Sequence, residues 1–368
     1  MNLFGKLHKK CACNIRKNTT MLKGLLFVMS ILHIFAEPTL RARELTELKE
    51  QNNDYEWKEF SHFQEKFSKR YSNLEELEKR FKIFRENLRD VIMHNLDWSQ
   101  NFTMGINQFS DLTSDEFKNT YVRNSFQRQP LGSFGCKPYS SNAAGAPNQI
   151  DWRDFDAVNP VRDQGQCGSC WAFATTANAE SVWAIQKGEL YDLSEEYLVD
   201  CASGMGYFNM GCNGGTPDSA FKYMINNGQC YEELYPYTAG VTKTASKCTS
   251  CTSTPVKFSG CLDVAPNDQI SLKAAVAINP VAVAIEADTR YFQSYAGGIL
   301  DSPQCGTTLD HAVEIIGYGT DNGIDYWNVR NSWGTTWGES GYFRVKRTSS
   351  TDDIGICGIA AEPSFLVV

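Results

Sequence analysis

The sequence predicts an α+β protein in two halves, a helix-rich half followed by a strand-rich half, with a separate helical segment before them. Apolar residues recur at steps of three and four over residues 54–97, which indicates helices. Helical patterns dominate the first half of residues 150–368, and strand-like runs separated by glycine-rich turns dominate the second half. Helices that precede strands in this way favour an α+β fold, and a cleft between the halves is the natural place for a site.

Residues 1–36 have the charge and the apolar run of a secretory signal peptide. They carry six lysines and arginines and no acidic residue, and the run Leu25–Ala36 is broken only by Ser30 and His33. This run is short for a membrane span but suits a signal-peptide core. We expect a signal peptide over 1–36, with a signal anchor as the alternative and Met21 as an alternative start.

Residues 54–97 are predicted to form two helices, and residues 121–149 a linker. The second helix is charged, but its apolar residues form one stripe that packs against another element. The linker is rich in Asn, Ser, Gln, Gly, Pro and Ala, a composition that predicts a flexible segment accessible to cleavage. The stripe consists of Leu77, Phe81, Phe84, Leu88 and Val91.

A compact domain is predicted over residues 150–368. Its first long helix contains apolar residues from Trp171 to Ile185 and ends at Gly188, a residue type that commonly closes helices. Ser194 precedes two glutamates and is predicted to cap the next helix. The predicted strands are Val281–Ala287, Ala312–Tyr318, Ile324–Arg330 and Tyr342–Lys346.

Charge and cysteine content narrow the class of protein. Residues 136–368 contain 14 lysines and arginines against 26 acidic residues, which argues against nucleic-acid binding because that function needs a basic surface. Of the 13 cysteines, eleven lie at or after Cys136, a density typical of disulfides and of an oxidising compartment. If one of the eleven is a reactive thiol, the other ten can pair.

Cys170 is the candidate nucleophile. It lies between a glycine-rich turn and an apolar helix, where the positive end of the helix dipole favours thiolate over thiol. Gln164 precedes it by six residues. The Gln164 side-chain amide and the backbone N–H of Cys170 are predicted to donate to the oxyanion of a tetrahedral intermediate, and such a donor is typically worth about 3 kcal/mol of barrier.

His311 and Asn331 are the candidate partners of this thiolate. A thiolate nucleophile needs a cation beside it and a proton carrier for the leaving amine, and His311 is the single histidine after residue 94. Asn331 opens the segment Asn-Ser-Trp-Gly, and its carbonyl can accept the proton of one imidazole nitrogen and so turn the other towards sulfur.

Two other cysteine chemistries fit the sequence less well. Cys167 and Cys170 have the C-x-x-C spacing of thiol oxidoreductases, but no βαβ pattern surrounds them. Cys248 and Cys251 have zinc-ligand spacing, but the region offers one histidine and disulfides explain clustered cysteines. We therefore expect no metal ion and no cofactor.

Three motifs resemble a known family. The segment Cys167–Trp171 matches the signature around the papain and cathepsin nucleophile. Gly105–Asp111 resembles the G-x-N-x-F-x-D element of cathepsin L-type propeptides. The residues at the spacing of the E-R-F-N-I-N propeptide signature, with Val for the usual Ile, are Glu76, Arg80, Phe84, Asn87, Val91 and Asn95. The chain therefore resembles a cathepsin L-like cysteine protease of the papain family, in precursor form.

The resemblance implies a papain-like two-lobe fold, with a helical left lobe and a β-barrel-like right lobe, preceded by a helical propeptide domain. The implied domains are an inhibitory propeptide over 37–120, a linker with the activation cleavage site over 121–149, and a peptidase domain over 150–368. The implied activity is thiol-dependent endopeptidase action, from a zymogen that its own propeptide inhibits.

The resemblance also implies partners and a location. Protein and peptide substrates, cystatin-type inhibitors and a monomeric state are expected, without nucleic acid and, after maturation, without a membrane. The secretory pathway would lead to the lysosome, the vacuole or the outside of the cell. The alternative is a non-catalytic secreted binding or inhibitory homologue, but such proteins usually lack the nucleophile or the histidine, and Cys170 and His311 are both present.

Substrate-binding roles follow from the same resemblance. Glu362 would lie at the floor of the main specificity pocket, and the small side chain of Ala284 would leave that pocket roomy. We expect large apolar residues and arginine to be accepted two positions before the scissile bond. Trp333 would shield the hydrogen bond between imidazole and asparagine. The full set is Gly214, Gly215, Thr216, Pro217, Ala284, Asp310, Ala312, Trp333 and Glu362.

The resemblance further pairs six cysteines, as Cys167–Cys212, Cys201–Cys248 and Cys305–Cys357. The remaining four would form two more disulfides, for which we expect Cys136–Cys261 with Cys230–Cys251. A cut between Cys136 and Ile150 would leave one thiol unpaired. Activation cleavage is therefore expected within residues 121–135.

Overall fold

The computed structural model describes residues 54–122, 130–204, 206–251 and 254–368. The predicted signal peptide or anchor over 1–36, the propeptide residues 37–53 and the linker residues 123–129 lie outside this range. Residues 60–368 form one compact unit, and the described part of the preceding unit is residues 54–59. Within the described ranges, no helix combines the length and the apolar composition that crossing a bilayer requires.

The two helices predicted over 54–97 are confirmed as α2 (Asp54–Lys66) and α3 (Leu74–Asn95). Asn73 caps α3, because its side chain accepts a hydrogen bond from the backbone N–H of Glu76. Most of the predicted stripe on α3 is buried, and Leu77 is half-buried. The short helix α4 (Ser114–Tyr121) follows and begins with a capping box.

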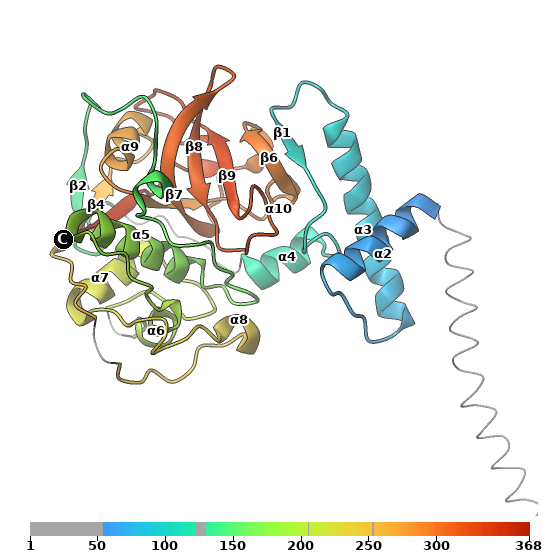
Figure 1. Cartoon of the computed structure of the whole chain (residues 1–368), viewed down its shortest axis with the longest axis horizontal. Helices are drawn as coiled ribbons and strands as arrows, with labels where there is room; N and C mark the ends of the chain where they lie inside the picture. The colour runs from blue at the N-terminus through green and yellow to red at the C-terminus, as the bar shows by residue number, and fades with distance from the viewer. Residues whose placement is uncertain (1–53, 123–129, 205, 252–253) are drawn as a thin grey trace, which may run out of the picture. The chain divides into compact units, whose positions relative to one another are not determined.

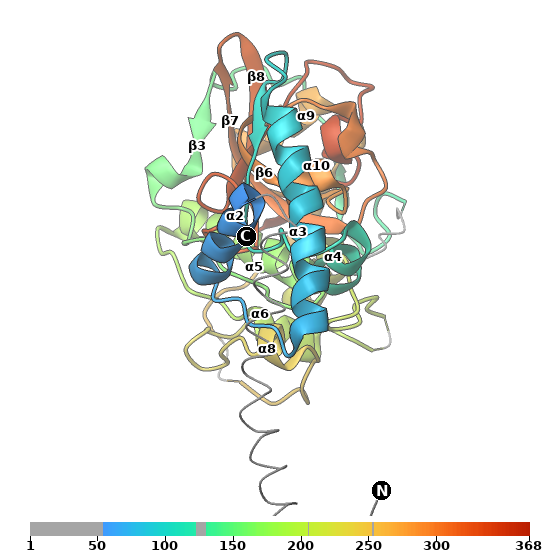
Figure 2. The ribbon, with the colours of Figure 1, turned by 90° about the vertical axis from the view of Figure 1, so that its right-hand side faces the viewer.

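The N-terminal segment joins the rest of the unit through a strand. β1 (Phe102–Met104) pairs antiparallel with β6 (Tyr295–Leu300), and α3 runs alongside β1 (Figures 1 and 2). Asn87 of α3 donates to the carbonyl oxygens of Ser110 and Leu112. One residue of the predicted propeptide signature thereby fixes the chain that follows β1.

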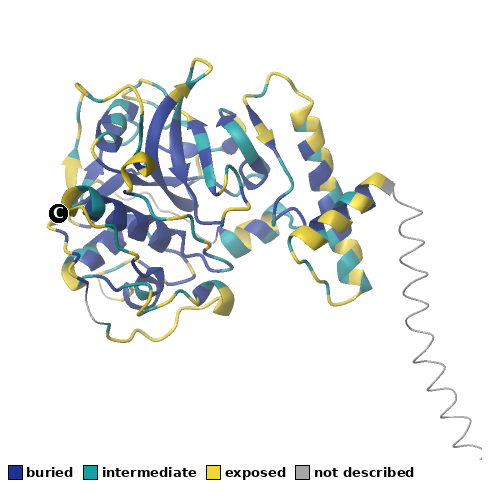
Figure 3. Cartoon of the chain, viewed as in Figure 1, coloured by how far each residue is buried: buried dark blue, intermediate teal, exposed yellow. Residues whose placement is uncertain are grey.

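The helix-rich half is built around α5 (Cys170–Lys187), whose first fourteen residues are all buried (Figure 3). The helix ends, as predicted, at Gly188 with a left-handed φ of 78°. The next helix, α6, is capped by Ser194, whose side chain accepts from the N–H of Tyr197. The helices that complete this half are α6 (Glu195–Cys201), α7 (Pro217–Asn227) and α8 (Ala239–Thr242).

The strand-rich half forms a sheet with the order β1-β6-β9-β8-β7-β5-β10-β4-β2, and β3 pairs with β7. This sheet does not close, so the expected barrel-like lobe is an open, mixed sheet. The two strands that carry the site, β7 and β8, pair antiparallel. The remaining elements are β3 (Ile150–Asp151), β4 (Gly260–Val264), α9 (Gln269–Val276), β5 (Val281–Ile285), α10 (Arg290–Gln293), β7 (His311–Asp321), β8 (Ile324–Arg330), β9 (Tyr342–Lys346), β10 (Ser364–Val367) and the short 3₁₀ helices Trp152–Phe155, Pro303–Cys305 and Ile356–Gly358.

Residues 130–149 correct the prediction of a flexible linker. They include β2 (Lys137–Tyr139), which pairs parallel with β4, and the backbone N–H of Gly132 donates to Asp263. The side chain of Phe134 is 7% exposed. Composition alone suggested flexibility, but β4 and Asp263, which bind this segment, are more than 100 residues away in sequence. We call residues 130–149 the strap.

Five disulfides are present, and they join the pairs that the sequence analysis expects. One of them, Cys136–Cys261, ties the strap to β4. Among the described cysteines, Cys170 alone is not disulfide-bonded. The other four bonds are Cys167–Cys212, Cys201–Cys248, Cys230–Cys251 and Cys305–Cys357.

Candidate active site

Cys170 is the first residue of α5 and is fully buried. Ser169, at the N-cap, makes no side-chain capping bond, and the first turn contains no acidic residue. No capping side chain and no carboxylate therefore offsets the positive end of the helix dipole, which favours a negative charge on the Cys170 sulfur. The Cys167–Cys212 disulfide fixes the turn that leads into the helix.

The side chain of Gln164 is held in one orientation by three hydrogen bonds. Its Oε1 atom accepts from the Ser332 hydroxyl at 2.7 Å. Its Nε2 atom donates to the carbonyl oxygen of Cys167 at 2.9 Å and to that of Tyr121 at 3.0 Å. Because the Oε1 acceptor is already used, the amide N–H groups point towards the turn before Cys170 and towards the N-terminal segment.

Tyr237 contacts both sides of this turn and was not predicted from the sequence. Its hydroxyl donates to the backbone oxygen of Gln164 at 2.7 Å and lies 2.8 Å from the Ser169 hydroxyl. Its ring packs edge-on against Phe173, with the centroids 4.9 Å apart. Tyr237 thus links the backbone of Gln164 to the residue before Cys170, a role that no local pattern distinguishes among the chain's 16 tyrosines.

The same turn requires a glycine. Gly165 has a φ of +58°, and a Cβ atom there would lie 2.7 Å from the backbone oxygen of Gly240. The N–H of Gln166 donates to that same oxygen at 2.9 Å. Any side chain at Gly165 would therefore push the turn away from Gly240 and displace Gln164.

His311 and Asn331 are in direct contact. The Nε2 atom of His311 lies 2.7 Å from Oδ1 of Asn331. A carbonyl oxygen can only accept, so Nε2 carries the hydrogen and the Nδ1 atom is left without one in the neutral ring. Nδ1 has no hydrogen-bond partner among the described residues. Burial lowers the pKa of His311 to about 4, and the Asn331 hydrogen bond opposes that shift.

The two halves of the candidate site lie on elements that touch. His311 opens β7, and β7 packs against α5, the helix that Cys170 opens. Trp333 stacks on the His311 ring at 4.6 Å between centroids and is fully buried. The indole therefore excludes water from the hydrogen bond between His311 and Asn331.

Aromatic side chains of the N-terminal segment cover Trp333. Phe109 and Phe117 both pack edge-on against its ring, at 5.5 and 5.2 Å between centroids. The side-chain amide of Gln108 donates to the backbone oxygen of Trp333 at 2.8 Å. Phe109 belongs to the G-x-N-x-F-x-D element, so this motif lies directly over the histidine half of the site.

The polar residues of the same segment bind the strand-rich half. The Asn107 amide donates to the backbone oxygen of Gln293 at 2.7 Å, and the Gln293 amide donates back to the oxygen of Phe109 at 3.0 Å. Lys118 of α4 forms an ion pair with Asp288. Burial, followed by the charge of Asp288, raises the pKa of the neighbouring Asp310 to about 8.

The predicted substrate-binding residues fall into two groups. Gly214 and Gly215 are buried in the turn before α7, and Thr216 caps α7 ahead of Pro217. On the other side, Ala284 of β5 pairs with Ala312 of β7, and Ala284 also packs with Leu309 and Ala361. Glu362, the residue after Ala361, is half-buried.

Asp218 lies near Glu362, and Asp263 lies near Asp218. Burial, then the charges of Asp263 and Glu362, raise the pKa of Asp218 to about 7. Asp263 is 6% exposed, and its Oδ1 atom has no partner among the described residues. Cys136, Asp218 and Asp263 lie within metal-ligand distance of one another, but the Cys136 sulfur is consumed by its disulfide. Two carboxylates are too few for a dedicated metal site, and the residues instead form an acidic cluster.

Known families match most of the chain. Residues 146–367 match the model described as papain family cysteine protease, and residues 60–117 match the cathepsin propeptide inhibitor domain. Germination-specific cysteine protease 1 of Arabidopsis thaliana is 44% identical over 299 residues, covering 79% of this chain and 77% of that protein. Fruit bromelain of Ananas comosus is 40% identical over 340 residues, covering 90% of each. The solved structure of digestive procathepsin L 3 from Tenebrio molitor larval midgut superposes with a TM-score of 0.75 at 38% identity, covering 85% of this chain and 99% of that one.

Proposed function

This chain belongs to the papain family of cysteine proteases and is a cysteine endopeptidase with an inhibitory propeptide domain, and we propose that Cys170, His311 and Asn331 are its catalytic residues. The observation that carries this assignment is the 2.7 Å contact between His311 and Asn331. It leaves Nδ1 of the imidazole for a partner on the neighbouring helix that Cys170 opens.

In the proposed reaction, the Cys170 thiolate attacks the peptide carbonyl carbon and forms a tetrahedral intermediate. The Gln164 amide and the Cys170 N–H donate to its oxyanion. The His311 imidazolium then gives its proton to the leaving amine, which leaves a thioester on Cys170. In the second half, neutral His311 takes a proton from water as the water oxygen attacks the thioester carbonyl. The C–S bond then breaks, which releases the carboxylic acid and restores the Cys170 thiolate and the His311 imidazolium.

The propeptide domain inhibits the chain that carries it, and we propose that it does so at two points of this machinery. The carbonyl oxygen of Tyr121 accepts from Gln164, so it uses the side-chain donor that the oxyanion needs. The side chains of Phe109 and Phe117 cover Trp333 and close the histidine half of the site. Removal of the propeptide would free both.

Activation cleavage is proposed to fall before Cys136, within residues 121–135. The support is the Cys136–Cys261 bond together with the pairing of β2 and β4, which tie the strap to a strand of the predicted peptidase domain. Mass spectrometry of the acid-matured enzyme tests this. A mature N-terminus between Cys136 and Ile150 would contradict it.

Substrate choice is proposed to depend on a pocket between Pro217 and the paired alanines Ala284 and Ala312, with Glu362 at its floor. Ala284 and Ala312 are paired across β5 and β7, and alanine has a small side chain, which supports a preference for large apolar groups. The carboxylate of Glu362 supports acceptance of arginine two residues before the cleaved bond. Asp218, whose pKa is raised to about 7, adds negative charge there only above neutral pH.

We further propose a monomer that travels the secretory pathway to the lysosome, the vacuole or the outside, with protein and peptide substrates and cystatin-type inhibitors as partners. The five disulfides support this route, because such bonds persist in oxidising compartments.

Titration with the epoxide inhibitor E-64 tests the catalytic assignment. The matured enzyme should lose all activity when one equivalent has reacted, with the adduct on Cys170, while Cys170→Ala should remain unlabelled and inactive. A folded, propeptide-free wild-type sample that takes up no inhibitor would favour the alternative of a non-catalytic binding or inhibitory homologue.

A further inference from the structure

The N-terminal segment contains a carbohydrate acceptor motif at its junction with the strand-rich half. Asn101-Phe102-Thr103 has the N-x-T form of an N-glycosylation site. Phe102 is 3% exposed and packs against the His94 ring at 4.3 Å, whereas Asn101 and Thr103 are exposed. The alternation of β1 therefore turns both recognition side chains towards solvent.

The surroundings of Asn101 tolerate an attached sugar. Its Nδ2 atom donates to Oδ2 of Asp301 at 2.6 Å. An amide nitrogen carries two hydrogens, so one remains for Asp301 after the other is replaced. The backbone of Asn101 is fixed independently, because its carbonyl oxygen accepts from the N–H of Ile299 at 2.8 Å. Modification therefore need not disturb the pairing of β1 with β6.

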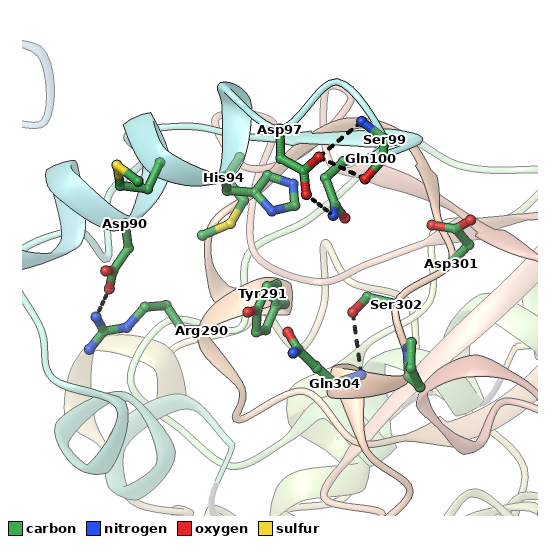
Figure 4. A pocket seen from close by; sticks show the side chains of 13 residues that line it. Asp90, His94, Asp97, Ser99, Gln100, Arg290, Tyr291, Asp301, Ser302 and Gln304 are labelled. Atoms are coloured by element: carbon green, nitrogen blue, oxygen red, sulfur yellow. Dashed lines mark hydrogen bonds and ion pairs between the residues drawn. The ribbon is translucent and has the colours of Figure 1, made fainter.

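A cavity of about 680 Å³ lies next to this position (Figure 4). Its walls come from α3 and the turn after it on one side, and from α10 and the segment 301–304 on the other. Gln100, the neighbour of Asn101, and Asp301, its hydrogen-bond partner, both line the cavity. We call it the seam cavity, because its walls come from both the propeptide and the peptidase domains.

The lining of the seam cavity suits a sugar. The rings of His94 and Tyr291 offer flat apolar faces, and Gln100, Asp301 and Ser302 offer hydrogen-bonding groups. Most of the lining is polar or charged, including Asp97, Arg290 and Asp301, and a sugar presents many hydroxyl groups that can hydrogen-bond to such side chains. The position of Asn101 at its rim would bring the first sugars to it without any change of the backbone.

We propose that Asn101 carries an N-linked oligosaccharide whose first sugars contact the seam cavity and strengthen the hold of the propeptide on the peptidase domain. The transfer uses an oligosaccharide linked to a polyprenol diphosphate. The bond between Nδ2 and the anomeric carbon forms as the bond from that carbon to the diphosphate oxygen breaks, and the displaced amide hydrogen leaves as a proton taken up by the diphosphate. The inference rests on the proposed secretory route.

The proposal has a consequence for the mature enzyme. The sequence has one other N-x-S/T triplet without a central proline, at Asn18, within the predicted signal peptide, and none after Thr103. All N-linked sugar should therefore leave with the propeptide.

Expression of the full chain in a secretory eukaryotic host, followed by peptide N-glycosidase treatment, tests the modification. The wild-type zymogen and Thr103→Ser, which keeps the motif, should both shift in mass. Asn101→Gln, Thr103→Ala and the matured wild-type enzyme should not. A wild-type zymogen that contains its five disulfides but shows no shift in mass would contradict glycosylation of Asn101 and leave the proposed secretory route unaffected. A zymogen without disulfides would instead count against the route and, with it, against this proposal.

Acid processing of the same zymogens tests the contact with the seam cavity. Asn101→Gln and Thr103→Ala should mature at least twofold faster than wild type and Thr103→Ser. Equal rates in all four, or slower maturation of the unglycosylated pair, would overturn the stabilising contact.

Discussion

The side-chain amide of Gln164 donates a hydrogen bond to the backbone oxygen of Tyr121, 3.0 Å away. The same amide is the proposed oxyanion donor, so we propose that in the zymogen the Tyr121 carbonyl, at the start of the linker, takes the place of the substrate's own oxygen. Four predictions follow from this geometry and from the contacts around it.

Replacing Gln164 should remove most of the activity of the mature enzyme. Gln164→Ala takes away one of the two proposed oxyanion donors, and such a loss typically lowers kcat about 10²- to 10³-fold with little change in KM. Steady-state kinetics on a peptide reporter measure both constants. Ser332→Ala is the matched control, because it removes only the hydroxyl that holds Oε1 of Gln164, and we expect a smaller loss. A Gln164→Ala enzyme with wild-type kcat would refute the assignment.

Tyr237 should support catalysis without contacting substrate. Tyr237→Phe keeps the ring on Phe173 but loses both hydroxyl contacts, each worth about 1 kcal/mol. We expect kcat to fall roughly tenfold and the free energy of unfolding to fall by about 2 kcal/mol. Tyr235→Phe is the control, because its hydroxyl bonds Asp200 on α6 instead. Equal kinetics for the two variants would show that Tyr237 is purely structural.

The stability of the zymogen should fall as the pH drops from about 6.5 to about 4. His311 has a pKa of about 4 in the folded zymogen against an ordinary value of about 6.5. Between these values the unfolded chain binds more protons, so acid destabilises the folded state, by about 2–3 kcal/mol at pH 4.5.

Urea unfolding at pH 7 and pH 4.5 measures this effect in a Cys170→Ala zymogen, which cannot process itself. Adding His311→Gln removes the titrating group while every other ionisable residue stays in place. The difference in free energy of unfolding between the two zymogens should therefore be smaller at pH 4.5 than at pH 7. If this difference in free energy of unfolding is the same at both pH values, His311 has the same pKa in the folded and unfolded chains.

Glu362 should control the acceptance of arginine. Glu362→Ala should lower kcat/KM for an Arg-Arg dipeptide reporter about tenfold relative to a Phe-Arg reporter, because a charge-assisted hydrogen bond is lost. Asp218→Asn removes a neighbouring charge only above about pH 7, where Asp218 is ionised, and in that range it should have a smaller effect in the same direction. If neither variant changes the ratio of kcat/KM between the Arg-Arg and Phe-Arg reporters, the proposed pocket is wrong.

The sequence predicted elements that have a local pattern, but it did not predict strands that depend on partners distant in sequence. The strands β8 and β9 have their predicted bounds, and α5 ends at Gly188 as expected, because their patterns are local. The strands β2 and β6 were not predicted. Lys137–Tyr139 is short and mostly exposed, and Tyr295–Leu300 contains two glycines, so their pairing comes from distant partners that no local pattern reveals.

In the candidate site too, the sequence predicted some residues and missed others. Cys170, His311, Asn331 and Gln164 stand in motifs whose residue types carry chemistry, and the sequence therefore singled them out. Tyr237 and Ser332 act through hydrogen bonds to Gln164, and their residue types are common in many other roles. Only the folded chain brings them to the turn before Cys170.

The bond that ties the strap to β4 bears on how the enzyme is handled. Thiol enzymes are stored with a reductant, which could also attack structural disulfides. Cys136 and Cys261 are only 4% and 3% exposed, so a small thiol has no direct path to their sulfurs in the native protein. Buffers that keep the nucleophile reduced should therefore leave the N-terminal end of the mature chain attached, and the strap should come free only once heat or denaturant opens the domain.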